Sequence, residues 1–401
     1  MIAILKREWK SYFQNITGWL FIAAVLALYG LYFLAYNLRA GYPYVSYTLS
    51  AISFIMLIAV PILTMRSMAE ERHSRTDQLV LTAPVSLGKM IFGKFLAMVG
   101  VFTVAVAVIA VTPLVLAAFG TVPMGENYVA VLGFWLYGCT CIAVGMLASA
   151  LTESQVIAAV VAFAFLFLGY MMNSITGLIG DHLITKVLGA YDLYTPLQSF
   201  MSGCLDLTGV VYFVSVTALC LFLTCQCVQK RRWSMTTKKL TTGMFSVAMI
   251  VVGFAVAVAV NMVVKEMPSS WTAVDATSTK LYSLTDTTKD YVKNLSQDVT
   301  IYVLSSEKSA DSTLAETLQR YEDLSKHLNV VYKDPAKSPN FYQQYTDSAP
   351  SQNSMIVVSD ARSRVVDYSD IYEYSYDYST YSSSVDGYDA EGQLTSALQY
   401  V

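Results

Sequence analysis

A polar stretch at residues 65–94 holds the side chains whose types and spacing could do chemistry. Four of its charged residues fall within six positions: Glu70, Glu71, Arg72 and Arg75. Apolar runs at 46–65 and 95–118 flank the stretch, and about 20 apolar residues suffice to cross a bilayer as a helix. Charged groups held in water between two membrane helices could form ion pairs with a soluble protein. The alternative is a solvated loop whose charges only set the topology of the chain.

A phosphate-binding motif is matched only in part by residues 88–94. The sequence there is GKMIFGK, which fits the spacing GxxxxGK. A phosphate loop needs Ser or Thr directly afterwards to hold magnesium. Here Phe95 follows, and a long apolar run begins with it. We therefore interpret Lys89 and Lys94 as anchors that hold the start of a membrane helix at the membrane surface.

The sequence contains no convincing catalytic or metal-binding set. The only histidines are His73, His182 and His327, in separate parts of the chain, and neither HExxH nor GxSxG occurs. Cys225 and Cys227 are separated by one residue, and no second pair with metal-ligand spacing follows. We therefore predict no catalytic residues, no cofactor and no metal site, and we do not expect an enzyme.

The composition is that of an integral membrane protein with a second module. Of the 401 residues, 55% are hydrophobic and 14% are charged, whereas soluble domains carry about 25% charged residues. Residues 1–264 hold 15 Lys and Arg against 9 Asp and Glu, and residues 265–401 hold 11 against 20. We expect a basic membrane part and an acidic tail, and no nucleic-acid partner.

Seven apolar segments have the length and composition of membrane helices: 18–36, 46–65, 95–118, 129–150, 156–174, 209–227 and 243–264. No acidic residue falls near the middle of any of them, which argues against a proton- or sodium-coupled carrier. Residues 1–15 have apolar side chains on one face and predict an interfacial helix, or else the first turn of a longer membrane helix. The half-apolar loop at 175–208 predicts short re-entrant or interfacial helices.

The distribution of basic residues predicts the orientation of the helices. One side receives 13 Lys and Arg, including those of residues 1–15 and 65–94, and the other side receives only Arg39 and Lys186 over the first six helices. Because basic loops stay in the cytoplasm, we place the N-terminus and the 65–94 stretch there. Seven crossings then place residues 265–401 outside the cell.

The tail alternates between strand and helix patterns and predicts an α/β domain. Strands are expected at 299–304, 329–333 and 354–358, and a helix at 312–327. Residues 367–388 are rich in Tyr, Ser and Asp, which is typical of a solvated loop or polar hairpin, or of a surface that binds sugars or a partner protein. The helix-like sequence at the end predicts that the chain is cut inside a domain.

Two parts of the sequence resemble a known family. The segments MAEER at 68–72, TDQLVLTAPVS at 76–86 and the pair Lys94-Phe95 resemble the cytoplasmic loop of type 2 ABC exporter permeases, and PLQSFMSGCLDLTGVVYF at 196–213 is similar to their last outer loop and sixth helix. The permease looks like the gliding-motility (GldF-like) type. The segments DATSTKLYSLT at 275–285 and EGQLTSAL at 391–398 look like parts of a GldG-like auxiliary protein.

The resemblance implies a domain plan and a set of partners. It implies a six-helix permease at 1–232, a basic linker with a seventh helix at 233–264, and an extracytoplasmic α/β auxiliary domain at 265–401. The residues expected to couple to an ATPase on a separate chain, within the loop at 66–94, are Glu70, Glu71, Arg72, Arg75, Thr76, Leu79 and Pro84.

The function so implied is export across the cytoplasmic membrane of a bacterium. A second permease chain and the lipid bilayer are the other expected partners, together with an envelope partner of the outer domain. The alternative is a force-transmitting or scaffold component that does not itself translocate a substrate.

Overall fold

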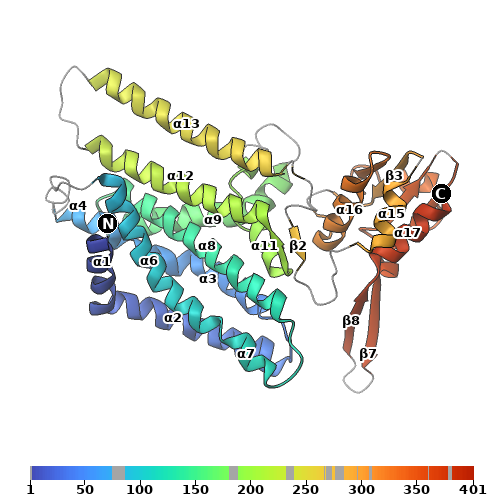
Figure 1. Cartoon of the computed structure of the whole chain (residues 1–401), viewed down its shortest axis with the longest axis horizontal. Helices are drawn as coiled ribbons and strands as arrows, with labels where there is room; N and C mark the ends of the chain where they lie inside the picture. The colour runs from blue at the N-terminus through green and yellow to red at the C-terminus, as the bar shows by residue number, and fades with distance from the viewer. Residues whose placement is uncertain are drawn as a thin grey trace. The chain divides into compact units, whose positions relative to one another are not determined.

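Figure 1 shows the computed structural model, which divides into two compact units. It describes residues 2–74, 86–179, 188–231, 239–265, 267, 273–275, 284–295, 297–306, 309–359, 361–377 and 382–401. The first unit comprises residues 1–267 and 272–278, and the second comprises 268–271 and 279–401.

Helices make up nearly all of the first unit. In the segment 2–74 these are α1 (Ile2–Gln14), α2 (Ile16–Phe33) with a π-helical end (Leu34–Arg39), α3 (Ser46–Thr64) and α4 (Arg66–His73). After it come α6 (Leu87–Ile109), α7 (Thr112–Ala117), α8 (Met124–Leu151), α9 (Gln155–Ile179), α11 (Thr195–Met201), α12 (Leu207–Arg231) and α13 (Lys239–Lys265).

Helix α8 is the central element of the first unit, and α3, α6, α9, α11 and α12 pack around it. Its glycines let the neighbouring helices approach closely, because larger side chains would fill the contact. A Cβ atom at Gly138 would lie 2.2 Å from the ring of Phe102 on α6, and one at Gly145 would lie 2.3 Å from Oγ1 of Thr64 on α3.

The prediction of seven membrane-spanning helices is confirmed by length and composition, since seven helical segments among the described residues are long and apolar enough to cross a bilayer. The polar stretch differs from the simple loop that we expected. Its first residues form α4, directly after α3, and α6 begins at Leu87 instead of residue 95. Residues 88–94 are therefore helical, which excludes a phosphate-binding loop at the GxxxxGK match.

Two short strands pair the segment directly before α12 with the segment that follows α13. Strand β1 (Cys204–Asp206) directly precedes α12, and β2 (Ala273–Asp275) follows α13. The two strands pair in antiparallel register, with Leu205 opposite Val274. The helix α11, just before β1, agrees with the short helix that we expected at 175–208.

The second unit contains a four-stranded mixed sheet in the order β4-β3-β5-β6. The strands are β3 (Val299–Val303), β4 (Leu328–Tyr332), β5 (Met355–Val358) and β6 (Ser363–Val366). Strands β3 and β4 run parallel, and the connection between them is α16 (Ser312–Leu324), as a parallel pair requires. The alternation of buried and half-buried residues along β3 places Val299, Ile301 and Val303 in the core.

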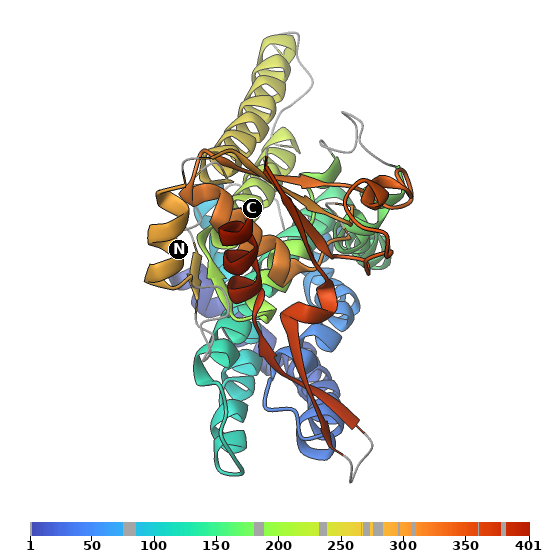
Figure 2. The same ribbon diagram turned by 90° about the vertical axis from the view of Figure 1, so that its right-hand side faces the viewer.

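Helices α15 (Asp286–Lys293), α16 and α17 (Ala390–Tyr400) contribute the rest of that core, including Val292, Leu318 and Leu394. The predicted α/β domain is thus confirmed. The Tyr-rich segment forms the hairpin β7 (Tyr372–Asp377) and β8 (Ser382–Tyr388), which extends away from the sheet and the helices of its own unit (Figure 2).

Candidate functional site

Helix α4 is fixed to α8 through one buried serine. The hydroxyl of Ser149 accepts hydrogen bonds from the backbone N–H groups of Met68 and Ala69, each at 3.1 Å, and donates to the carbonyl of Met65 at 3.0 Å. The first N–H groups of a helix have no partner within it, so Ser149 supplies the cap that α4 lacks. The start of α4 is therefore held against the central helix of the unit.

A buried lysine joins three helices at this end of the unit. Lys94 of α6 is only 3% exposed, and its ammonium lies 2.6 Å from Oε1 of Glu71 on α4 and 3.8 Å from Oε1 of Glu8 on α1. It also donates to the carbonyl of Ser67 at 3.0 Å. A buried charge is tolerated only with such partners, so Lys94 requires α1 and α4 to stay in place.

Arg7 extends this cluster along α1. Its guanidinium lies 2.5 Å from the carboxylate of Glu8 and 3.6 Å from that of Glu71. The hydrogen bond to Glu8 raises the pKa of Arg7 above its ordinary value, against the opposing effect of partial burial. We call Arg7, Glu8, Glu71 and Lys94 the ion-pair cluster.

Two further ion pairs connect α4 to its other neighbours. Arg66 forms a bidentate pair with Glu70 at 2.7 and 2.8 Å, and it donates to Thr17 at the start of α2 at 3.2 Å. Arg72 lies 2.8 Å from Glu153, between α8 and α9, and donates to the carbonyl of Leu151 at 3.3 Å. Through these contacts and the ion-pair cluster, α4 is bonded to α1, α2, α6 and the turn after α8.

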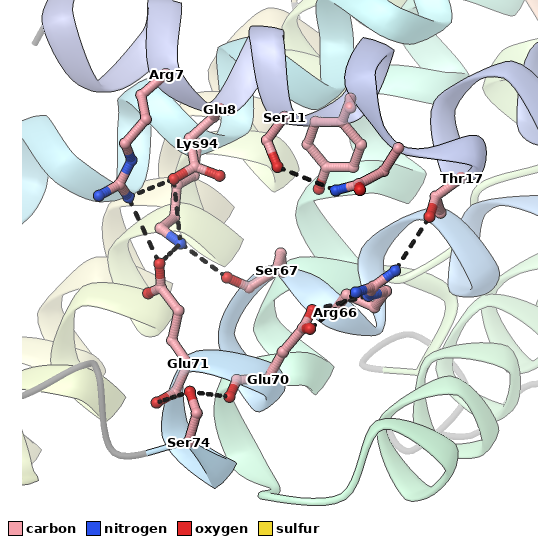
Figure 3. A pocket seen from close by; sticks show the side chains of 12 residues that line it. Arg7, Glu8, Ser11, Thr17, Arg66, Ser67, Glu70, Glu71, Ser74 and Lys94 are labelled. Atoms are coloured by element: carbon pink, nitrogen blue, oxygen red, sulfur yellow. Dashed lines mark hydrogen bonds and ion pairs between the residues drawn. The ribbon is translucent and has the colours of Figure 1, made fainter.

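A polar cleft of about 510 Å³ lies among these residues (Figure 3). Side chains of α1, α4, the start of α2 and Lys94 of α6 line it, and the labelled charged groups point toward one another across it. The hydroxyl of Ser67 on α4 is buried and has no hydrogen-bond partner within the described part of the chain.

Helix α1 is also held by packing on α6. A Cβ atom at Gly100 would lie 1.6 Å from the ring of Trp9, so only glycine leaves room for the indole. The aromatic rings of Trp9, Phe13 and Trp19 follow one another at 5.2 and 5.4 Å between centroids. Helix α1 is thus a separate helix packed on the bundle, and the break from α2 falls at Asn15.

The structure brings together three of the residues that the sequence singled out. Glu70, Glu71 and Arg72 all lie on α4 and all form ion pairs within the chain. The others, Arg75, Thr76, Leu79 and Pro84, lie outside the described residues. Whether any of these side chains contacts a soluble partner stays a prediction.

Sequence reasoning missed the partners of these residues. Lys94 was interpreted as a surface anchor, which is wrong because its side chain is buried under α1 and α4. A lysine in the second helical turn of an apolar helix was the available signal. Glu8, Arg66, Ser149 and Glu153 were not predicted, because their contacts join segments that are distant in sequence.

Within the described ranges, no group of three or more His, Cys, Asp and Glu side chains is placed so that it could hold a metal ion. None of the six cysteines, all of which lie in the described part of the chain, forms a disulfide, and four of them are buried.

Comparison with known families identifies two regions of the chain. Residues 39–228 match the ABC-2 family transporter protein, and residues 278–371 match a domain of unknown function, DUF7088. No curated protein matches the chain. The first match extends from the end of α2 to α12 and includes α4, α6 and α8. The chain therefore carries an ABC-2 family transporter membrane domain followed by a DUF7088 domain.

Proposed function

We propose that this chain is the permease subunit of an ABC exporter, driven by an ATPase on a separate chain that acts on α4. The single observation that carries the proposal is the bonding of α4 to α1, α2, α6 and α8 through Lys94, Arg66, Arg72 and Ser149. A displacement of α4 would break several of these bonds unless the other helices moved with it. Such an element can pass a movement made by a soluble partner into the helix bundle.

The orientation that this requires rests on charge. In the sequence, the side that carries residues 1–15 and 65–94 receives 13 Lys and Arg and the other side receives 2 over the first six predicted helices, and basic loops stay in the cytoplasm. An ATPase would reach α4 and residues 75–85 from that side. The second unit would then lie outside the cell, where an envelope partner could bind it.

The ATPase would close on ATP and move α4 and α1 together. Two permease chains would pair in the membrane, each contributing six helices, and the movement would open a path between them. Glu70, Glu71 and Arg72 would act mainly inside the chain, by tying α4 to its neighbours, while residues 75–85 with Arg75, Thr76, Leu79 and Pro84 would meet the ATPase.

Site-specific crosslinking to the ATPase encoded beside this chain tests the proposal. Cysteine introduced at Ser74, at the end of α4, should crosslink to the co-purified ATPase. The matched control is a cysteine at the exposed Tyr42, which lies between the end of α2 and the beginning of α3. This cysteine should not crosslink to the ATPase. Failure of the ATPase to co-purify, or crosslinking at Tyr42 instead, would contradict the proposal.

A second candidate is a force-transmitting component of a gliding-type envelope complex. The pairing of β2 with β1 favours it, because the chain that leads to the second unit is held at the beginning of α12. Movement of α12 would then act on the outer domain without transport. Transport of a substrate by the reconstituted complex would exclude this candidate.

A further inference from the structure

The polar cleft between α1 and α4 lies at the level expected for lipid headgroups. The candidate span 46–73 consists of α3, which has 19 residues and is about 29 Å long at 1.5 Å per residue, and of α4, which follows it. The hydrocarbon core is only about 30 Å thick, and the headgroup layers bring the bilayer to about 40–45 Å. Glu70, near the end of this span, and Thr17, near the beginning of the first, therefore lie in a headgroup layer.

The charges around the cleft are balanced. Three cationic side chains, Arg7, Arg66 and Lys94, face three carboxylates, Glu8, Glu70 and Glu71. A bound anion would be repelled by the three carboxylates, and a bound cation would be repelled by the three cationic groups. The six groups already pair with one another, and a zwitterion with one phosphate and one ammonium adds no net charge to them.

Donors for a phosphate are present in the cleft. A guanidinium carries five N–H groups, and Arg66 uses three of them in the hydrogen bonds described above. Ser67 is one of the residues that line the cleft, it is 7% exposed, and its buried hydroxyl has no partner among the described residues. An unsatisfied buried hydroxyl is costly, so a ligand that accepts its hydrogen bond would be favoured.

Exposed apolar side chains are close in sequence to residues that line the cleft. Asn15 and Thr17 line the cleft, and their neighbours Ile16 and Trp19 are 79% and 57% exposed. Trp residues favour the membrane interface. The polar cleft and the apolar beginning of α2 together match a molecule with a charged head and a hydrocarbon tail.

We propose that this cleft binds the headgroup of a zwitterionic aminophospholipid. The phosphate accepts hydrogen bonds from Arg66 and Ser67, the ammonium donates to Glu70, and the acyl chains lie along Ile16 and Trp19. This inference concerns the purified chain in lipid and does not rest on the proposed coupling to an ATPase.

Photocrosslinking in nanodiscs tests this assignment. The full chain is placed in phosphatidylcholine nanodiscs with a minor fraction of phosphatidylethanolamine that carries a photoactivatable group at the beginning of one acyl chain. Crosslinks should map to the peptides that contain Ile16 or Arg66. Unlabelled phosphatidylethanolamine should compete, and phosphatidylglycerol should not.

Two variants and a control locate the site. Ser67→Ala removes one hydrogen bond and should lower crosslinking about two- to tenfold, and Arg66→Gln should lower it further. Arg39→Gln, at the other end of α2 and exposed, should leave it unchanged. Crosslinks spread along all lipid-facing helices, or equal competition by phosphatidylglycerol, would overturn the proposal. Competition by free phosphoethanolamine at the same concentration would identify a soluble zwitterion instead and would also overturn it.

Discussion

At the scale of single residues, the proposed transmission of movement through α4 depends on the contact between Lys94 and Glu71. Glu71 is 21% exposed and Lys94 is 3% exposed, so little water screens the ion pair. Removing one partner of a buried pair leaves an uncompensated charge and costs about 3–5 kcal/mol, whereas replacing both by uncharged groups is often nearly neutral.

Glu71→Gln should therefore lower the thermal stability of the detergent-solubilised chain. The double variant Glu71→Gln/Lys94→Met should recover most of the loss, because the buried Lys94 charge is then absent and Glu8 keeps Arg7 as its partner. Intrinsic fluorescence during heating measures both effects. The matched control is Lys89→Met, an exposed lysine five residues earlier on α6, which should leave the melting temperature unchanged. A double variant as unstable as Glu71→Gln would contradict the role of the pair.

In the second unit, Asp367 provides a test of pH dependence. Burial acts to raise the pKa of Asp367, but hydrogen bonds from the N–H and hydroxyl groups of Ser369 and Ser351 outweigh it and hold the pKa well below its ordinary value. Because the pKa is lower in the folded state, the stabilisation is complete above about pH 4, the ordinary value for Asp, and is lost as the pH falls below it.

Asp367→Asn should cost about 1–2 kcal/mol of stability in the second unit at pH 7, after allowance for solvent screening, and less at acid pH. Proteolysis of the full chain at increasing urea concentrations measures this stability, when it is read from the peptides of the second unit. The exposed Asp347 offers a control in Asp347→Asn. An equal loss at pH 7 and pH 3 would contradict the assignment.

Some residues around α4 could be predicted from the sequence, and others could not. Glu70, Glu71 and Arg72 could be selected because charged residues between two apolar runs are unusual. The partner that covers Lys94 could not be predicted, because that helix, α1, lies about 80 residues or more earlier in the chain. Ser149 caps α4 from α8, and nothing in its local sequence distinguishes it from other small residues of that helix.

At the scale of elements, the long helices could be predicted and their ends could not. Apolar length alone identified all seven candidate spans. The beginning of α6 was placed eight residues too late, because the glycines and lysines of 88–94 are poor markers of a membrane helix. They are helical because α1 and α4 cover Lys94, and this tertiary contact overrides local composition.

Packing of α1 on α6 gives a prediction for Gly100. Gly100→Ala should force Trp9 out of its contact and destabilise the chain by about 1–3 kcal/mol, as overpacking does. Adding Trp9→Ala should relieve the clash, so that the two effects are not additive. Thermal unfolding of both variants measures this. Gly30→Ala on α2 is the control, because nothing lies within 4 Å of its Cβ position. Additive losses would show that the two residues do not meet.

At the scale of the whole molecule, the chain divides into two compact units. The charge asymmetry and the change of periodicity marked the boundary near residue 265. The strand pairing of β1 with β2 was not predicted, since three-residue strands leave no pattern in a sequence. It keeps residues 273–275 with the first unit.

A disulfide tests this pairing in the native chain. Leu205→Cys/Val274→Cys places two cysteines at directly opposed positions of the antiparallel pair, whose Cβ atoms lie about 4.5–5.5 Å apart. The bridged peptide should form under mild oxidation and be found by mass spectrometry. Leu205→Cys alone controls for pairing with the native cysteines. Two alkylated, unbridged cysteines would contradict the register.

The transmission of movement through α4 is the central claim, and ATP hydrolysis by the assembled complex tests it most directly. The chain and its co-purified ATPase are placed in lipid, and ATP turnover is compared between the wild type, Lys89→Met and Glu71→Gln/Lys94→Met. We predict that the double variant still assembles with the ATPase but loses most of the stimulation that the wild-type permease gives, while Lys89→Met keeps it. Full stimulation by the double variant would show that the Glu71–Lys94 contact does not transmit the movement, and would contradict the account.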